Sequence, residues 1–413
     1  MGDGSVKFVE QNLLNTDLTL NLSQNIPWTG GSLFLETSAQ RMDLFSEHKY
    51  SWQTSPIMIG YRQSLFGYNS LKWDKRIEPV RYQEAKKSYV ETLELVSANA
   101  INKFFALATA QSNYDIASFN YANADTLYRY AQGRYNIGTI TENEMLQLEL
   151  NRLTEETNRM NARIEMDNCM QELRSYLGIQ EEREIRVRVS SRIPDFSINL
   201  NEALALAYEN SPDIQTMKRR KLESESAVAR ARANAGLKAD IYLRFGLTQT
   251  ADKLPEAYRN LLDQQYVSLS ISLPILDWGR GKGQVRVARS NRDLVYTQVE
   301  QNRTDFELNV RKLVKQFNLQ TQRVRIAART DETAQRRNEV ARKLYILVKS
   351  TILDLNASIS EKDSARRNYV SALYNYWSLY YTLRSMTLYD FESNKLLTED
   401  YNLLICLLYT SPS

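Results

Sequence analysis

Residues 134–145, with the sequence RYNIGTITENEM, have the signals of a turn between two helices. Gly138 stands where the first helix ends, since glycine adopts the left-handed backbone conformation without steric cost. Thr139 or Thr141 then caps the second helix, and Glu144, three residues after Thr141, completes a capping box. The stretch predicts a helical hairpin with its tip at Gly138.

The same hairpin is encoded twice, at an offset of 210 residues. From Phe306 to Tyr345, mainly apolar residues recur at alternating steps of four and three positions. The positions 210 residues earlier, from Val96 to Tyr135, are also mainly apolar. A period of 3.5 residues, sustained in this way, is typical of helices packed along a coiled-coil seam. The repeat indicates an ancestral duplication of one long hairpin.

Each repeat is expected to contain a long outgoing helix, at residues 75–134 and 279–347, and a return helix, at residues 141–177 and 351–390. At about 1.5 Å per residue, the outgoing helices would be roughly 90–100 Å long. Many seam residues are alanine or serine, which allow close approach of neighbouring backbones. A tightly packed barrel of helices is therefore favoured over a two-stranded zipper.

Ahead of each long helix the apolar period changes from 3.5 to 2, which predicts two strands per half. In the second half the alternation covers residues 239–247 and 266–273, and in the first half it covers residues 18–23 and 57–62. Segments of about 9–11 residues cross a bilayer when tilted. An ordinary amphipathic sheet with one face on a soluble core explains the same alternation.

Aromatic residues flank these strands. Trp28, Trp52, Trp73 and Trp278 stand at or beyond the strand ends, where the aromatic girdle of a membrane barrel lies. Four strands cannot close a barrel alone, because the smallest membrane barrels need about eight. A membrane interpretation therefore requires an oligomer.

Composition excludes several classes of function. The 413 residues include 53 basic and 49 acidic side chains, 14 glycines, 8 prolines, one histidine and two cysteines. Few glycines and prolines disfavour turn-rich β folds, and His48, Cys169 and Cys406 are too few for a zinc site or a disulfide framework. No apolar run reaches the roughly 20 residues of a membrane helix. We predict no catalytic residue, no metal and no cofactor.

Several motifs resemble those of the TolC-like outer-membrane efflux proteins. Residues 200–214, LNEALALAYENSPDI, are similar to the family's helix-opening segment, and residues 273–280, LPILDWGR, to its strand-to-helix passage. Residues 63–66, QSLF, are a weaker first-half counterpart, and residues 135–141, YNIGTIT, resemble the family's helix-tip turn. The resemblance extends over roughly residues 15–390, and the order and duplication of the motifs make it specific.

The resemblance implies a fold that is mainly α with β, in which two membrane strands and a long coiled-coil hairpin form a duplicated unit. Three chains would form a 12-stranded β-barrel in the outer membrane and an α-barrel across the periplasm. The homotrimer would be the passive exit duct of a tripartite efflux or secretion system. A periplasmic adaptor would link it to an inner-membrane pump of RND or ABC type.

The resemblance also divides the chain. The expected segments are the first pair of barrel strands at 1–74, the first long hairpin at 75–180, a connecting equatorial segment with the helix leading to the second half at 181–236, the second pair of barrel strands at 237–278, the second long hairpin at 279–390, and a tail at 391–413. The family's first helix should precede the first strand, so an N-terminally truncated fragment is expected. The apolar end of the tail is expected to be non-native.

Candidate site residues follow from the same resemblance. In the family, acidic residues just past the second tip form a pore constriction. In this chain Asp354 takes the first of these positions and Ala357 takes the second. Glu144 is the equivalent of Asp354 in the first repeat. The alternative is that each acid stabilises the first turn of its helix. The residues expected to contact the adaptor lie at the two tips: Tyr135, Gly138, Thr139, Thr141, Tyr345, Lys349, Ser350 and Thr351. The second tip has Val348 in place of the family's glycine.

Residues 279–349 carry 17 basic and 7 acidic side chains. A basic helix can bind nucleic acid, but these charges are spread around the helix without stacking aromatics, so we predict no nucleic-acid partner. We interpret the charges as a solvated face that forms salt bridges to residues 140–180, which carry 8 acids and 4 bases. The rival function is a soluble or peripheral coiled-coil scaffold without channel activity. A periplasmic adaptor is a third reading, but it would have one hairpin between lipoyl-like and barrel halves, not two hairpins at a fixed offset.

Overall fold

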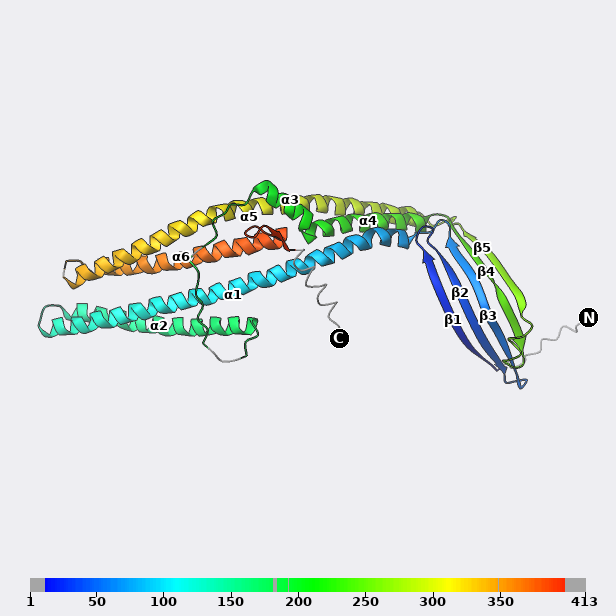
Figure 1. Ribbon diagram of the computed structural model, residues 1–413, viewed down its shortest axis with the longest axis horizontal. Coiled ribbons are helices and arrows are strands. Elements are labelled where there is room, and N and C mark those ends of the chain that lie inside the picture. Colours follow the sequence, from blue (N-terminus) through cyan, green and yellow to red (C-terminus); the bar gives the residue numbers. More distant parts are fainter. Residues whose placement is uncertain (1–11, 181–183, 192, 348, 398–413) are drawn as a thin grey trace, which may run out of the picture. The chain divides into compact units, whose positions relative to one another are not determined.

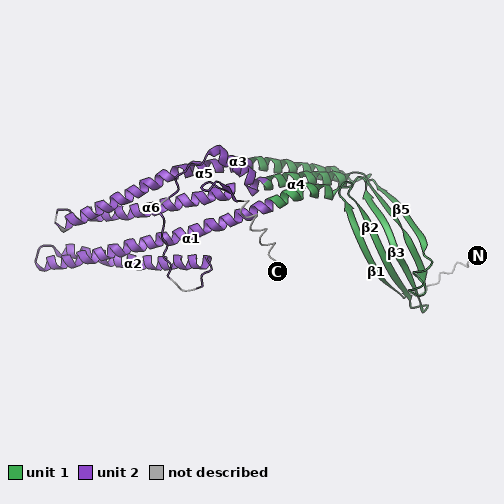
Figure 2. Cartoon of the chain, in the orientation of Figure 1, with its two compact units in different colours: residues 1–83, 215–302 green, residues 84–214, 303–413 purple. Residues whose placement is uncertain are grey.

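The structure, a computed structural model, describes residues 12–180, 184–191, 193–347 and 349–397. The chain divides into two compact units (Figure 2). Unit 1 contains residues 1–83 and 215–302, and unit 2 contains residues 84–214 and 303–413. The two units are described separately below.

Unit 1 contains a five-stranded antiparallel sheet in which the strands follow one another in chain order (Figure 1). Its strands are β1 (Leu13–Ile26), β2 (Gly31–Leu44), β3 (Lys49–Ser64), β4 (Lys238–Ala251) and β5 (Leu262–Ser272). Although β3 and β4 belong to different halves of the sequence, they pair over most of their length. The duplicated chain therefore forms one continuous sheet.

The first half contains three strands where two were predicted, because β2 has no regular alternation. Leu33, Phe34 and Leu35 are consecutive apolar residues, and a register shift between Glu36 and Ser38 interrupts the pairing of β2 with β3. Phe34 lies on the face opposite Leu33 and Leu35, where its ring covers Gly60 so closely that a Cβ at position 60 would come within 2.1 Å of it. A period-2 search does not detect a strand with apolar residues on both faces.

The helices confirm the predicted repeat. They are α1 (Ser70–Asn136), α2 (Glu142–Tyr176), α3 (Leu200–Asn210), α4 (Pro212–Ala235), α5 (Arg280–Ile346) and α6 (Ile352–Thr387). Both α1 and α5 have 67 residues, and they begin and end 210 residues apart. At about 1.5 Å per residue each is roughly 100 Å long. The mixed class of strands and long helical hairpins predicted from the sequence is confirmed.

Unit 2 contains two helical hairpins, one from each repeat (Figure 1). In the first hairpin, Leu107 of α1 belongs to a buried cluster with Met166 and Leu173 of α2. In the second, Phe317 of α5 contacts Tyr376 of α6, with ring centroids 5.2 Å apart. Buried apolar side chains at heptad spacing therefore hold each hairpin together, as the 3.5-residue period predicts.

The segment after α6 folds back instead of leaving the unit. Strands β6 (Tyr389–Asp390) and β7 (Lys395–Leu396) form a small hairpin, and Leu388 and Leu397 are buried with Val90 of α1. The tail was predicted to begin at residue 391, so its first seven residues are part of the folded unit. The apolar end expected to be non-native lies outside the described residues.

Within the described ranges, no helix has both the length and the apolar character needed to span a membrane.

Candidate functional site

One face of the sheet carries aliphatic side chains on all five strands. Register pairing places Leu22, Leu35, Ile59 and Phe245 in one row across β1, β2, β3 and β4. A neighbouring row contains Leu33 of β2, Tyr61 of β3, Leu243 of β4 and Val267 of β5, and Leu269 and Ile271 continue the same face of β5. The side chains in the row of Leu22 are 42–71% exposed, so no other element of the described chain covers them.

The opposite face is polar and aromatic. Arg244 pairs with Glu36 at 3.6 Å, and Asn21 of β1 donates a hydrogen bond to the same carboxylate at 3.4 Å. The ring of Tyr242 stacks on Phe34 at 5.8 Å and lies under the guanidinium of Arg62 at 5.5 Å. The two faces differ as the outer and inner faces of a membrane barrel do.

The four predicted tryptophans lie toward the two ends of the sheet. Trp28 is in the turn between β1 and β2, Trp73 is in the first turns of α1, and Trp278 lies two residues before the start of α5. Trp52 lies near the start of β3, at the opposite end, beside Arg41. Trp52 is twelve residues from the last residue of β3, Ser64, or roughly 40 Å at about 3.3 Å per residue. At a tilt near 45° this length spans about 28 Å, close to the apolar band of about 25 Å of a membrane barrel.

The first helix tip has the predicted caps. Gly138, with a φ of 73°, ends α1, and the N–H groups of Gly138 and Thr139 donate to the carbonyls of Tyr135 and Arg134 at 2.9 Å. This is the Schellman arrangement. Thr141 is the N-cap of α2, and Glu144 completes the capping box by accepting from the Thr141 N–H at 2.9 Å.

The second tip repeats these bonds at an offset of 210 residues. The N–H of Lys349 donates to the carbonyl of Leu344 at 2.9 Å, as Thr139 does to Arg134. Thr351 caps α6 by accepting from the N–H of Asp354 at 3.2 Å, as Thr141 does from Glu144. Val348 lies outside the described residues.

Both acids predicted for the pore constriction serve as cap partners. Hydrogen bonds from Thr351 and Ser350 lower the pKa of Asp354, and hydrogen bonds from Thr141 lower the pKa of Glu144. The alternative role in the first helical turn is therefore present in the structure. Each carboxylate is also exposed and ionised at neutral pH, so capping leaves its charge available at the tip.

Residues 203–387 match the family model described as outer membrane efflux protein. This match confirms the resemblance predicted from the sequence and supports the function of an outer membrane efflux channel. No curated protein matches the sequence.

Solved outer membrane channels have the same fold. The CmeC channel of Campylobacter jejuni is similar with a TM-score of 0.68 and 14% identity, over 95% of this chain and 81% of that chain. VceC of Vibrio cholerae gives a TM-score of 0.63 and 14% identity, over 91% and 87% of the two chains. The open state of MtrE of Neisseria gonorrhoeae gives 0.64 and 12%, over 92% and 80%. At such low identities, the likeness establishes a shared fold.

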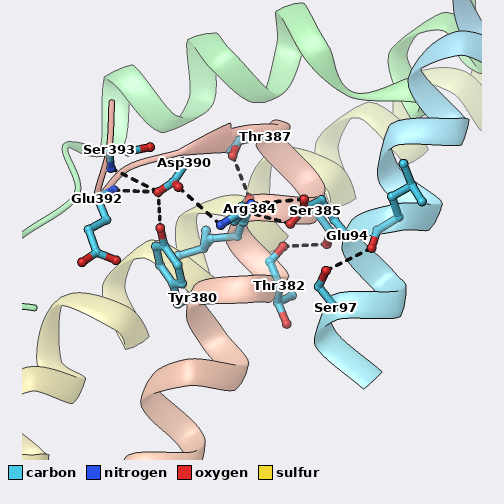
Figure 3. Close-up of polar contacts among 12 residues, drawn as sticks. Glu94, Ser97, Tyr380, Thr382, Arg384, Ser385, Thr387, Asp390, Glu392 and Ser393 are labelled. Carbon is cyan, nitrogen blue, oxygen red and sulfur yellow. Dashed lines mark hydrogen bonds and ion pairs between the residues drawn. The ribbon is translucent and has the colours of Figure 1, made fainter. Parts of the chain in front are cut away.

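A buried charge network, not predicted from the sequence, joins α1 to α6 and to the small hairpin behind α6 (Figure 3). Glu94 of α1 has a fully buried side chain and pairs with Arg384 of α6 at 2.8 Å. Arg384 also pairs with Asp390 of β6 at 3.3 Å, and Asp390 accepts a hydrogen bond from Tyr380. Burial alone would raise the pKa of Asp390, but the hydrogen bonds from Tyr380 and Ser393 outweigh burial and lower it.

The predicted ion pairs between α5 and α2 are not among those seen in the described parts of the chain. Instead, Arg325 pairs with Asp195, Arg337 with Glu361 of α6, and Asp331 with Arg366 of α6. Other charges of α5 pair along the helix itself at a spacing of three or four residues. The basic residues of α5 therefore stabilise mainly their own repeat.

Proposed function

We propose that this protein is the outer-membrane channel of a tripartite efflux or secretion system. In this proposal three copies join their sheets into one barrel in the outer membrane, and their helical hairpins form a tunnel in the periplasm. Substrates diffuse through the duct after a pump of RND or ABC type delivers them through a periplasmic adaptor. The chain itself performs no covalent chemistry.

The continuous aliphatic face of the sheet carries this proposal. A soluble sheet buries such a face against a helix or a second sheet. Here Leu22, Ile59 and Val267 are 49–71% exposed, and together the rows form an apolar surface too large for a soluble monomer. Lipid is the environment that this face fits, while the polar face with Arg244 and Glu36 fits a water-filled lumen.

Exposed apolar residues on α2 support assembly from several copies. Their spacing of four, three, seven and four residues is that of coiled-coil seam positions, although the partner of α2 within the chain, α1, packs on its other side. They are Leu146, Leu150, Leu153, Met160 and Ile164, and they are 45–66% exposed. In the proposed trimer, a helix of a neighbouring copy covers this stripe.

The two tips are the proposed contact with the adaptor. Thr139 and Thr141 are exposed in one tip, and Lys349 and Thr351 are exposed in the other, beside the half-buried Ser350. The outgoing helices end beside these groups. Tyr135 and Gly138 are joined by a backbone hydrogen bond at the end of α1, and Tyr345 lies in the last turn of α5. In the trimer, Asp354, and in the first repeat Glu144, would form rings of carboxylates that constrict the pore and bind cations.

Refolding of the full chain into detergent tests the channel. We expect a trimer that dissociates on heating, contains both helix and strand, and conducts ions when added to planar bilayers. A monomer or dimer that remains soluble without detergent would instead support the coiled-coil scaffold and contradict the channel.

The adaptor contact has a separate test. In cells that express the channel together with its periplasmic adaptor, a photoreactive residue at Lys349 should cross-link to the adaptor. The same residue at Lys49, an exposed lysine at the start of β3, is the matched control and should give no adaptor product. Equal cross-linking from both positions would contradict the proposed role of the tip.

A further inference from the structure

The polar face of the sheet carries a cluster of large rings. Phe34 of β2, Tyr242 of β4 and Tyr266 of β5 form this ring cluster and lie in two neighbouring rows of the register. Elsewhere on the same face, β1 and β5 carry short polar side chains: Thr19, Asn21 and Ser23 on β1, and Ser268, Ser270 and Ser272 on β5. The ring cluster is therefore a local feature that the polar character of this face does not require.

Two glycines allow apolar side chains to lie flat beside the cluster. A Cβ on Gly60 would collide with the ring of Phe34, and a Cβ on Gly246 would collide with the sulfur of Met58. Met58 is fully buried, and Phe34 is nearly so. Glycine within a strand often marks a place where another group approaches the backbone closely. Here the two glycines produce a shallow apolar shelf on the polar face.

This shelf fixes the orientation of the two tyrosine rings. Tyr242 stacks on Phe34 with ring centroids 5.8 Å apart and an angle of 20° between the planes. Tyr266 meets Tyr242 edge to face, also at 5.8 Å, and is 53% exposed. A planar ligand can therefore stack on an exposed ring that is already held in place, which lowers the entropic cost of binding.

A guanidinium lies beside these rings. Arg62 of β3 is exposed, and its guanidinium carbon is 5.5 Å from the centre of the Tyr242 ring. Among the residues that the structure describes, Arg62 forms no ion pair, whereas the neighbouring Arg244 pairs with Glu36 at 3.6 Å. The charge of Arg62 is therefore available to a ligand that stacks on the ring cluster.

The charges of this part of the face favour anions over cations. Lys238 and Asp240 lie on the same face near the start of β4 and offset each other. The pair of Arg244 and Glu36 has no net charge, so Arg62 sets the sign beside the ring cluster. An aromatic cation would stack on the same rings but would be repelled by Arg62.

We propose that the ring cluster and Arg62 form a binding site for aromatic anions, such as arylsulfonates and aryl carboxylates, in the lumen of the channel. This inference rests on the proposed function and names a class of substrate for it. The ring of the anion stacks on Tyr266 and Tyr242, and its acid group pairs with the guanidinium of Arg62. Contacts that are partly exposed bind weakly, which suits a duct because a tightly bound substrate could not leave.

Block of the channel current by small organic ions tests this site. In planar bilayers that contain the full-chain channel, naphthalene-2-sulfonate should reduce the conductance at lower concentration than methanesulfonate, which has the acid group without the ring. The block should weaken at high KCl concentration, because salt screens the charge of Arg62. Trimethylphenylammonium, which has a ring and a positive charge, is the probe for the opposite sign.

Substitutions divide the site into its charge and its rings. Arg62→Gln should raise the half-blocking concentration of naphthalene-2-sulfonate about threefold, as expected for a partly exposed ion pair, and should not weaken block by trimethylphenylammonium. Tyr266→Ser should weaken the arylsulfonate block by a similar factor, and Tyr266→Phe should preserve it because the ring remains. Lys238→Gln is the matched control, since it removes an exposed positive charge from the same face at a distance of four residues from Tyr242.

The outcomes separate this site from the channel itself. Conducting trimers that naphthalene-2-sulfonate and methanesulfonate block equally would overturn the site while leaving the channel intact. So would an arylsulfonate block that Arg62→Gln and Lys238→Gln weaken equally. If Arg62→Gln does not assemble, an unchanged block in Tyr266→Ser would overturn the site on its own. A parent chain that forms no conducting trimer would contradict the proposed function, and the luminal site with it.

Discussion

The helical hairpins of unit 2 bury their large apolar side chains, whereas the sheet of unit 1 leaves many of its apolar side chains exposed. In unit 2, Phe317, Tyr376 and Leu107 are almost fully buried between helices of the same chain. In unit 1, most aliphatic side chains of the strands are exposed, and backbone hydrogen bonds hold the strands together. The hairpins are therefore stabilised largely from within, whereas in the proposed channel lipid and further copies cover the exposed side chains of the sheet.

The largest expected effect is in unit 2, where Arg384→Met would leave Glu94 and Asp390 without their shared cation. Loss of one partner from a buried ion pair costs about 3–5 kcal/mol. We expect a much lower melting temperature for the helices, followed by circular dichroism at 222 nm in detergent. Glu94→Met combined with Arg384→Met should recover part of the loss, because both buried charges are then removed together.

Arg337→Met is the matched control for this variant. Arg337 pairs with Glu361 of α6, but both side chains are more than half exposed. Exposed pairs contribute less than about 1 kcal/mol. If the two variants lower the melting temperature equally, the buried network does not stabilise unit 2 as described.

The second expected effect is in the sheet. Val267→Arg places a charge on the aliphatic face, which costs about 2–4 kcal/mol near the middle of a bilayer. Refolding into lipid vesicles should then yield far less heat-sensitive trimer. Ser268→Arg, one residue along β5 and on the polar face, should fold like the parent chain. Equal yields from both variants would mean that the aliphatic face meets water and would favour the scaffold.

Much of the helical region was predictable because each repeat independently shows the same pattern of helices and turn. The 210-residue offset predicts both long helices, and the atoms of the two tips follow it down to the bond from Thr139 to Arg134 and its copy from Lys349 to Leu344. Glycine, threonine and acid side chains act locally at such a tip. Local signals of this kind are visible in one sequence.

The parts that escaped prediction depend on contacts between distant residues. Glu94 and Arg384 are 290 residues apart, and no sequence period connects them. Strand β2 escaped because Phe34 packs over Gly60 on the polar and aromatic face, which interrupts the alternation that marks a half-buried strand. The third strand that the described chain adds to the first half therefore came only from the structure.

A smaller effect is expected at the tips, where the two repeats can be compared directly. Thr141→Ala and Thr351→Ala each remove an N-cap and should cost about 1 kcal/mol locally. Hydrogen exchange of the first amides of α2 and α6 measures this loss, with Thr154→Ala, in the middle of α2, as the control. Protection that falls at one tip only would show that the second turn is held by something other than its cap.

The first tip should also depend on pH. Hydrogen bonds from Thr141 lower the pKa of Glu144 in the folded chain. The stabilisation by the capping box is therefore complete above the ordinary glutamate value of about 4.3 and is lost as the pH falls through the lower folded value. Exchange of the α2 amides should accelerate in that range in the parent chain and should be independent of pH there in Glu144→Gln. The same acceleration in Glu144→Gln would assign the effect to another group.

The smallest expected effect concerns conduction, and it separates the two roles that Asp354 has in the structure. As a cap partner it acts through hydrogen bonds with Thr351 and Ser350, while as a pore constriction it acts through its charge. Asp354→Asn keeps most of the shape and removes the charge, so it should weaken block by divalent cations and raise conductance by less than about twofold. Asp354→Ala should do the same if charge is decisive.

Since the folded pKa of Asp354 is lowered, block in the parent channel should persist below the ordinary aspartate value of about 3.9. Unchanged currents in Asp354→Asn, with loss of α6 protection in Asp354→Ala, would restrict this residue to capping and leave the constriction to other side chains.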